Sequence, residues 1–218
     1  MTEILYFDKD IVVCVKPVGA DSEKDMPELI RAGFKEKGIK KEKIFPLHRL
    51  DKPVGGIMIY ALNEASAAGI SEKIAKGTIK KEYLAIIQGI PDEESGIFED
   101  LLFKDSRRNK SYVVKRERKG VKKASLWYEV VDKTETFSLV RVKLNTGRSH
   151  QIRVQFASRK MPLAGDGKYG SKMGGCDIAL FSYKITLESG KVFEALPPAE
   201  KYPWNMFGLI PEHISNNE

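Results

Sequence analysis

The chain has 218 residues, of which 42% are hydrophobic and 31% are charged, a composition that fits a globular protein and excludes a disordered one. No apolar run approaches the roughly 18–20 residues that cross a bilayer, and the N-terminus lacks the apolar core of a signal peptide. These features predict a cytoplasmic protein that has no membrane partner.

The two cysteines, Cys14 and Cys176, are far apart and belong to no Cys-x-x-Cys pair. This spacing predicts buried free thiols rather than a disulfide framework or a zinc site. Cysteine usage therefore agrees with a cytoplasmic location.

The formal net charge of +7 is concentrated in one segment, residues 107–123, which we call the basic arm. The arm contains one acid and nine basic residues: Arg107, Arg108, Lys110, Lys115, Arg116, Arg118, Lys119, Lys122 and Lys123. Tyr112 and two valines interrupt these charges at strand-like spacing, which predicts an ordered arm rather than a mobile loop. A basic arm on a nearly neutral body favours a phosphate-rich partner. Because no amphipathic helix accompanies the charge, nucleic acid is favoured over a membrane surface.

Hydrophobic patterning predicts strands interspersed with a few helices. In chain order, we expect a strand at 11–15, a helix at 26–38, a strand at 55–62, a helix at 64–77 that ends at Gly77, strands at 78–89, 123–131 and 136–144, and a C-terminal hairpin that turns at Ser189-Gly190. Helices do not regularly separate the strands, so the pattern indicates an α+β fold with a largely antiparallel sheet. No linker or internal repeat divides residues 1–218, which predicts a single domain.

Segment 146–159 fits two structures. Its apolar residues alternate as in a strand, but Ile152 and Phe156 also share one face of a helix. We predict a helix that Thr146 or Ser149 caps. Such a helix would place three side chains near its N-terminus, where anions are favoured: Arg148, His150 and Arg153.

Several common motifs are absent or lack their structural context. Residues 165–170 match Gly-x-Gly-x-x-Gly, but no strand precedes them and the glycine-rich sequence after them does not favour a helix, so a turn is expected. The chain has no phosphate-binding loop motif, no close pair among its three histidines, and no Gly-x-Ser-x-Gly. The sequence therefore predicts no nucleotide cofactor, no other cofactor and no metal.

Five remaining motifs are informative together: KPVG (16–19), HRLD (48–51), KKEYLAIIQG (80–89), TGRSHQIRV (146–154) and PLAGDGKYG (162–170). With them the chain resembles the RluA-like pseudouridine synthases, class A of the synthases that modify large ribosomal RNA, over residues 16 to about 204. The resemblance implies a mixed, mostly antiparallel sheet flanked by helices, with the active-site cleft in its middle. It also implies an isomerase that converts uridine to pseudouridine in rRNA or tRNA.

This reaction breaks the bond between N1 and C1′ and joins C5 to C1′, without redox chemistry. The resemblance assigns the nucleophile to Asp51, and attack on C1′ of the ribose or on C6 of uracil remains open. It assigns Arg153 as the cation that keeps this carboxylate charged, an attraction of about 4 kcal/mol at 4 Å and an effective dielectric of 20. Tyr83 would stack on the detached uracil or accept the C5 proton.

The resemblance further implies that Arg49 enters the space left by the flipped base. The other expected substrate-binding residues are His48, Arg148 and His150. Many relatives carry an additional N-terminal RNA-binding domain, which we do not expect here. RNA affinity is therefore assigned to the basic arm of a monomer.

The chain departs from the family pattern after HRLD, where Val54-Gly55-Gly56 replaces the usual Thr-Ser-Gly. Two hydroxyls that could brace the Asp51 loop are missing, so a catalytically inactive RNA-binding protein remains an alternative. A hydrolase that uses Asp51 and His48 is a second alternative, which would require another acid or a metal.

Overall fold

The computed structural model describes residues 2–208, which group into two compact units. Unit 1 consists of Met1–Lys81 and Phe181–Pro197, and unit 2 of Glu82–Leu180 and Pro198–Glu218. The described residues form three α-helices and eleven strands. Strand pairs within each unit are antiparallel except for one parallel pair, so the expected α+β class with a mixed, mostly antiparallel sheet is confirmed. Among these residues no helix is long and apolar enough to span a membrane.

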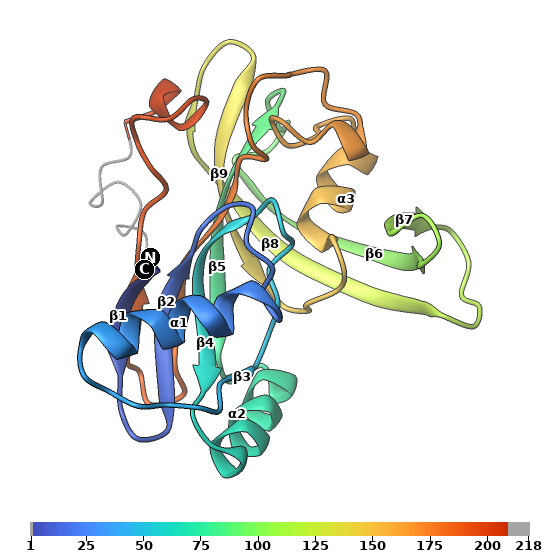
Figure 1. The fold of residues 1–218 in the computed structure, drawn as a ribbon. Coiled ribbons are helices and arrows are strands. Elements are labelled where there is room, and N and C mark those ends of the chain that lie inside the picture. Colours follow the sequence, from blue (N-terminus) through green and yellow to red (C-terminus); the bar gives the residue numbers. More distant parts are fainter. Residues whose placement is uncertain (1, 209–218) are drawn as a thin grey trace. The chain divides into compact units, whose positions relative to one another are not determined.

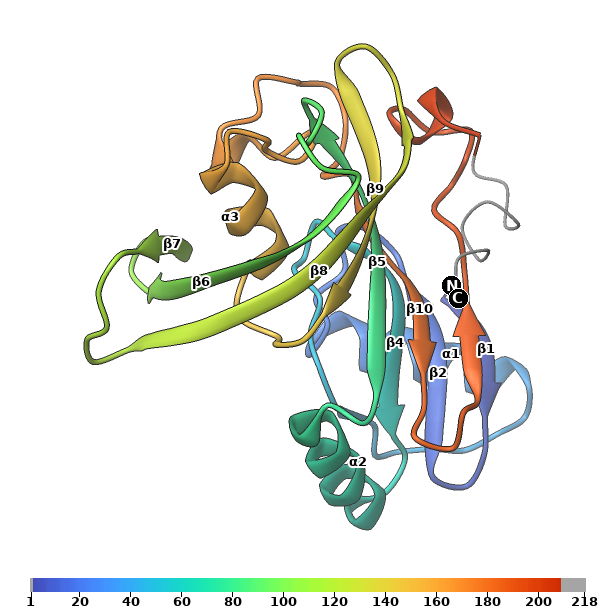
Figure 2. The same cartoon turned by 180° about the vertical axis from the view of Figure 1, so that it is seen from behind.

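The sheet of unit 1 brings the two ends of the chain together. Its strand order is β1 (Glu3–Phe7), β2 (Ile11–Lys16), β4 (Gly55–Ala61) and β10 (Leu180–Thr186), with β3 (Phe45–Pro46) on β4 and β11 (Val192–Glu194) on β10. Strands β4 and β10 form the parallel pair. Helix α1 (Asp25–Glu36) lies in front of these strands in Figure 1 and behind them in Figure 2, so it covers one face of the sheet.

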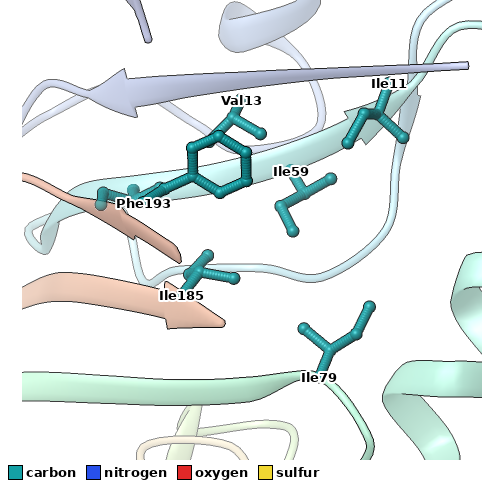
Figure 3. Close-up of a cluster of buried hydrophobic side chains, with 7 residues drawn as sticks. Ile11, Val13, Ile59, Ile79, Ile185 and Phe193 are labelled. Atoms are coloured by element: carbon teal, nitrogen blue, oxygen red, sulfur yellow. The ribbon is translucent and has the colours of Figure 1, made fainter. Parts of the chain in front are cut away.

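An apolar cluster fills one face of this sheet. It contains Ile11, Val13, Ile57, Ile59, Ile79, Ile185 and Phe193, and Figure 3 shows their side chains gathered in one region. Alternate residues of β2 and β4 supply four of them, as the two-residue period of a strand requires. Ile70 and Ile74 of α2 (Glu64–Lys76) pack against the cluster, and Gly77 ends this helix in the left-handed conformation that favours glycine. On α1, Met26, Ile30 and Phe34 are fully buried at helical spacing.

The sheet of unit 2 positions the basic arm. Its order is β5 (Lys80–Gln88), β9 (Phe137–Leu144), β8 (Val121–Lys133), β6 (Ser95–Asp105) and β7 (Lys110–Val114). Strands β6 and β8 run side by side toward the loop that joins β7 to β8 (Figure 2). The basic arm thus contains the edge strand β7, the loop 115–120 and the start of β8, and the prediction that it is ordered is confirmed.

The structure corrects several expectations. Segment 146–159 does contain a helix, α3 (Gln151–Ser158), but neither Thr146 nor Ser149 caps it. His150 occupies the N-cap with φ +54°, and the side chain of Gln151 instead accepts hydrogen bonds from Thr146 Oγ1 (2.8 Å) and the Arg148 amide (2.9 Å). Both cysteines are free, but only Cys14 is buried, because Cys176 lies in a half-exposed loop.

Candidate active site

Asp51 is located in the loop of unit 1 that leads into β4. Its side chain is half-buried, and its carbonyl oxygen accepts a hydrogen bond from the Val54 amide at 2.9 Å, which closes a turn. The turn leads directly into Gly55, the first residue of a strand that is buried along its whole length. The local backbone of the expected nucleophile is therefore fixed at the entrance to a core strand.

A buried lysine fastens this loop to the end of β2. Lys16 has no exposed surface, and its Nζ donates hydrogen bonds to the carbonyl oxygens of Ala20 (2.7 Å), Pro17 (3.0 Å) and Lys52 (3.2 Å). Burial lowers the pKa of Lys16 to about 8, and nearby carboxylates, among them Asp51, oppose this shift. The KPVG and HRLD motifs thus meet around one ammonium group.

His48 and Ser22 hold the first half of the loop. His48 Nε2 accepts the Ile59 amide of β4 at 3.1 Å, and burial, with Lys81 nearby, lowers the pKa of His48 to about 3. Its ring is therefore neutral at ordinary pH. Ser22 Oγ accepts the Leu50 amide (3.1 Å) and donates to the Leu50 carbonyl oxygen (2.9 Å). The substrate-binding role of His48 stays a prediction, whereas its hydrogen bond to the loop's own strand was not anticipated.

The Val54-Gly55-Gly56 segment fits its surroundings closely. Val54 is 1% exposed. Gly56 has φ +121°, and a Cβ there would lie 2.4 Å from the carbonyl oxygen of Ser182, so only glycine is accommodated. The missing hydroxyls do not leave the loop unsupported, because Lys16 and Ser22 bond it at other points.

Arg49 lies on the surface of the same loop. Its side chain is 62% exposed, and its guanidinium is 3.4 Å from Glu23. A surface ion pair of this kind contributes little to stability, about 0–1 kcal/mol. The guanidinium therefore gives up little stability if it leaves Glu23 for another partner.

Unit 2 contains Tyr83 and Arg153. Tyr83 lies in β5 opposite Val142 and is 6% exposed. Arg153 lies in the first turn of α3, and its guanidinium makes a two-pronged contact with Asp166: Nε to Oδ2 at 2.7 Å and Nη2 to Oδ1 at 2.9 Å. Both side chains of this pair are almost fully buried. Sequence reasoning missed Asp166 because it lies in the glycine-rich segment that was expected to be only a turn.

Other polar side chains surround the start of α3. His150 Nδ1 lies 2.8 Å from the hydroxyl of Tyr169, and this hydroxyl accepts the Ser111 amide of β7 at 2.8 Å. The exposed Arg148 donates from Nε to the Lys123 carbonyl oxygen at 2.9 Å. Arg148 and His150 are thus both attached to the base of the basic arm.

The charges of the basic arm are largely turned to solvent. Every lysine and arginine in it is exposed except Lys110, which is half-buried. Arg118 lies over the ring of Phe103 at 4.7 Å, and Lys110 lies over that of Tyr112 at 5.7 Å. The arm combines exposed cations with aromatic rings, a composition suited to nucleic-acid phosphates and bases.

The predicted site residues are divided between the two units. Unit 1 contains His48, Arg49 and Asp51, and unit 2 contains Tyr83, Arg148, His150, Arg153 and the basic arm. Within each unit the predicted residues lie near buried polar groups that the sequence did not reveal: Lys16 and Ser22 in unit 1, Asp166 and Tyr169 in unit 2.

Comparison with known proteins identifies relatives that share these motifs and this fold. The chain is 30% identical over 236 residues to the tRNA pseudouridine synthase C of Haemophilus ducreyi, covering 94% of this chain and 96% of that protein. It is 29% identical over 207 residues to the ribosomal large subunit pseudouridine synthase D of Borreliella burgdorferi, covering 86% of this chain and 61% of that protein. The chain thus spans less than two thirds of the length of some curated relatives, 41% in one case.

The fold is also found in a solved structure. Human RNA Pseudouridylate Synthase Domain Containing 4 superposes with a TM-score of 0.78 over 90% of this chain and 88% of that chain, at 23% identity. The sequence model described as RNA pseudouridylate synthase matches residues 10–158, which include HRLD and the whole of α3. The chain therefore belongs to the RNA pseudouridylate synthase family.

Proposed function

We propose that this protein is an RNA pseudouridine synthase, an isomerase that converts particular uridines of structured RNA to pseudouridine. Family membership supports the reaction class. The observation that carries the assignment for this chain is the fastening of the Asp51 loop, in which Lys16 Nζ bonds the Lys52 carbonyl oxygen next to the nucleophile. A nucleophile requires a fixed approach to the reacting carbon, and a loop bonded on both sides of Asp51 meets that need.

In the proposed reaction the carboxylate of Asp51 attacks the target nucleotide, at C1′ of the ribose or at C6 of the base. The glycosidic bond breaks, the base turns, C5 bonds to C1′, and the C5 proton leaves. Tyr83 stacks on the detached base or accepts that proton. Arg153 supports the negative charge of the reacting carboxylate, and Asp166 holds its guanidinium plane.

We assign RNA binding to the basic arm together with Arg148 and His150. Lysines and arginines that replace condensed counterions on phosphates supply affinity that is largely independent of sequence. The substrate is rRNA or tRNA, as the names of the two relatives suggest for those proteins. We further propose a cytoplasmic monomer, a single catalytic domain, that uses no nucleotide cofactor.

The test is chemical mapping of pseudouridine in total RNA from cells with the gene, without it, and with an Asp51→Asn copy. Asparagine is nearly isosteric with aspartate but is no nucleophile. We expect at least one pseudouridine site to disappear in the deletion and to return with wild-type protein but not with the variant.

Purified Asp51→Asn should bind the same RNA as tightly as wild type, because phosphate contacts dominate affinity. An unchanged pseudouridine map in the deletion, with RNA binding intact, would support a catalytically inactive RNA-binding protein. Turnover by Asp51→Asn within about tenfold of wild type would remove Asp51 from its role as nucleophile.

A further inference from the structure

The hydroxyl of Tyr169 joins the basic arm to the helix that carries Arg153. Tyr169 is 9% exposed and ends the short 3-10 helix Gly167–Tyr169. Its oxygen accepts the Ser111 amide at 2.8 Å and lies 2.8 Å from His150 Nδ1. One phenol oxygen therefore contacts strand β7 of the arm and the N-cap of α3.

Strand β7 needs such a partner because it is the edge of its sheet. Ser111 is 2% exposed, so its amide would be costly to leave unpaired. Two more hydrogen bonds close the same junction: Ser111 Oγ donates to the Ser149 carbonyl oxygen at 2.7 Å, and Lys168 Nζ donates to the Asn109 carbonyl oxygen at 3.2 Å. The root of the arm is thus bonded to the segment before α3 and to the loop of Tyr169.

The ring of Tyr169 contacts the charged groups on either side. Arg153 Cζ and Lys110 Nζ each lie 5.1 Å from the ring centroid. The ring also belongs to an apolar cluster with Leu102 and Val154. Tyr169 therefore packs against the first basic residue of β7 and against the arginine that Asp166 holds.

The hydroxyl also determines which nitrogen of His150 carries the proton. A phenol has one proton to donate, and its oxygen already accepts the Ser111 amide. The remaining donation goes to His150 Nδ1, so the neutral ring carries its proton on Nε2. This tautomer makes Nε2 a hydrogen-bond donor.

We propose that Tyr169 is a positioning residue that locks the root of the basic arm to α3, so that RNA held by the arm is presented in one fixed orientation to Arg153. The proposal rests on the proposed function. It separates two properties: the charges of the arm set how tightly RNA binds, whereas the Tyr169 junction sets how fast bound RNA reacts.

The experiment compares wild type with Tyr169→Phe, which keeps the ring but removes the hydroxyl. The matched control is Tyr128→Phe, another buried tyrosine of unit 2, whose hydroxyl donates to the Glu93 carbonyl oxygen at 3.3 Å. The substrate is total RNA, tritiated at C5 of its uracils, from cells that lack the gene, because the reaction releases the C5 hydrogen. Release is measured with saturating enzyme, and affinity is measured separately with the same RNA.

We expect Tyr169→Phe to slow tritium release about ten- to hundredfold, the cost of a small misplacement, while the dissociation constant changes less than about twofold. Tyr128→Phe should match wild type in both. Nitrogen-15 NMR should place the proton of His150 on Nε2 in wild type and detect a change in Tyr169→Phe but not in the control. The assignment is tractable because the chain has three histidines.

Ser111→Ala provides a second test that does not touch Tyr169. It removes the bond to Ser149 and should also slow release without weakening binding, and the double variant should lose less than the product of the two effects. Unchanged release in both variants, or a loss of affinity that parallels the loss of rate, would overturn the proposal while active wild type left the proposed function standing. Wild type that released no tritium would overturn both.

Discussion

The Nζ of Lys16 donates a hydrogen bond to the carbonyl oxygen of Lys52, 3.2 Å away, and so fixes the peptide that directly follows Asp51. Two further carbonyl oxygens accept from the same ammonium group. A buried cation is stable only when its donors are satisfied, and here the backbone provides the acceptors. The KPVG motif thereby determines the conformation of the HRLD motif.

This arrangement predicts a particular dependence of stability on pH. The pKa of Lys16 is about 8 in the folded protein and 10.5 in its ordinary state. Between these values the unfolded chain holds a proton that the folded chain has lost, so this residue's contribution makes the free energy of unfolding rise with pH, by up to about 1.4 kcal/mol per pH unit. Urea unfolding of wild type and Lys16→Met across this range measures the difference, and parallel curves would contradict the assignment.

His48 predicts the opposite limb of the stability profile. Its pKa is about 3 in the folded protein and 6.5 in its ordinary state, mainly because of burial. As the pH falls from about 6.5 toward 3, the unfolded chain gains a proton that the folded chain refuses. This residue alone should therefore reduce the free energy of unfolding by up to about 1.4 kcal/mol per pH unit.

His48→Gln tests this limb, since a glutamine oxygen has the chemistry to accept the Ile59 amide and does not titrate. The variant should lose stability less steeply than wild type between about pH 6 and 4 in urea unfolding. If acid weakens both proteins equally, another group sets the acid limb and His48 is not buried as a neutral ring.

Elements with strong local signals were predictable, and elements that depend on distant partners were not. Gly77 and the helix before it were expected at their observed positions, because a glycine C-cap is a local feature. Strand β6, by contrast, was not predicted. Charged residues interrupt its apolar pattern, and its pairing with β7 and β8 determines its conformation.

The candidate site follows the same division. Motif resemblance selected Asp51 and Arg153, but the groups that hold them are distant in sequence. Lys16 is 36 residues from the carbonyl oxygen of Lys52 that it bonds, and Asp166 is 13 residues from Arg153. No periodicity links such pairs, because each is created by tertiary packing.

The basic arm predicts a loss of affinity without a loss of sequence preference. Replacing the exposed Lys115, Arg116 and Lys119 by alanine should weaken binding to unrelated RNAs alike and reduce the slope of affinity against salt by about 0.7 per lost phosphate contact on single strands. Arg118 is left intact because it packs on Phe103.

The control for the arm removes the same charge elsewhere. Lys35, Lys37 and Lys40 are exposed residues of unit 1, and their alanine variants should leave the salt slope nearly unchanged. If both triple variants lose affinity equally, net charge rather than the arm governs binding. Loss of affinity for one RNA sequence only would indicate that the arm reads bases.

Arg49 predicts a dependence on how the target uridine is stacked. Extracting a stacked base costs a few kcal/mol, and a planar guanidinium that stacks on the neighbouring bases offsets part of that cost. Arg49→Ala should therefore slow modification of a stacked uridine far more than that of the same uridine in a bulge, as measured by single-turnover rates.

Glu23→Gln is the matched control for Arg49, since it removes the 3.4 Å ion pair and keeps the guanidinium. It should not slow either RNA. Equal slowing of both RNAs by Arg49→Ala would mean that the residue acts on the chemical step, and no slowing of either would leave it an ordinary surface arginine.

The buried pair of Arg153 and Asp166 permits stability and reactivity to be separated. Removing one partner leaves an uncompensated buried charge, so Arg153→Met and Asp166→Asn should each reduce the free energy of unfolding, by about 3–5 kcal/mol for the former. The double variant Arg153→Met/Asp166→Leu replaces both charges by apolar groups and should recover most of the stability that Arg153→Met loses. Denaturant unfolding of the four proteins measures this recovery.

Reactivity should not follow stability in this series. If Arg153 supports the reacting carboxylate, the double variant is folded and binds RNA through its intact arm, yet its tritium release stays as low as that of Arg153→Met. Asp166→Asn keeps the guanidinium but loses one anchor, so it should retain part of the rate. Recovery of tritium release along with stability in the double variant would show that Arg153 serves the fold alone and that the cation beside the nucleophile is another residue, with Arg148 the first to test.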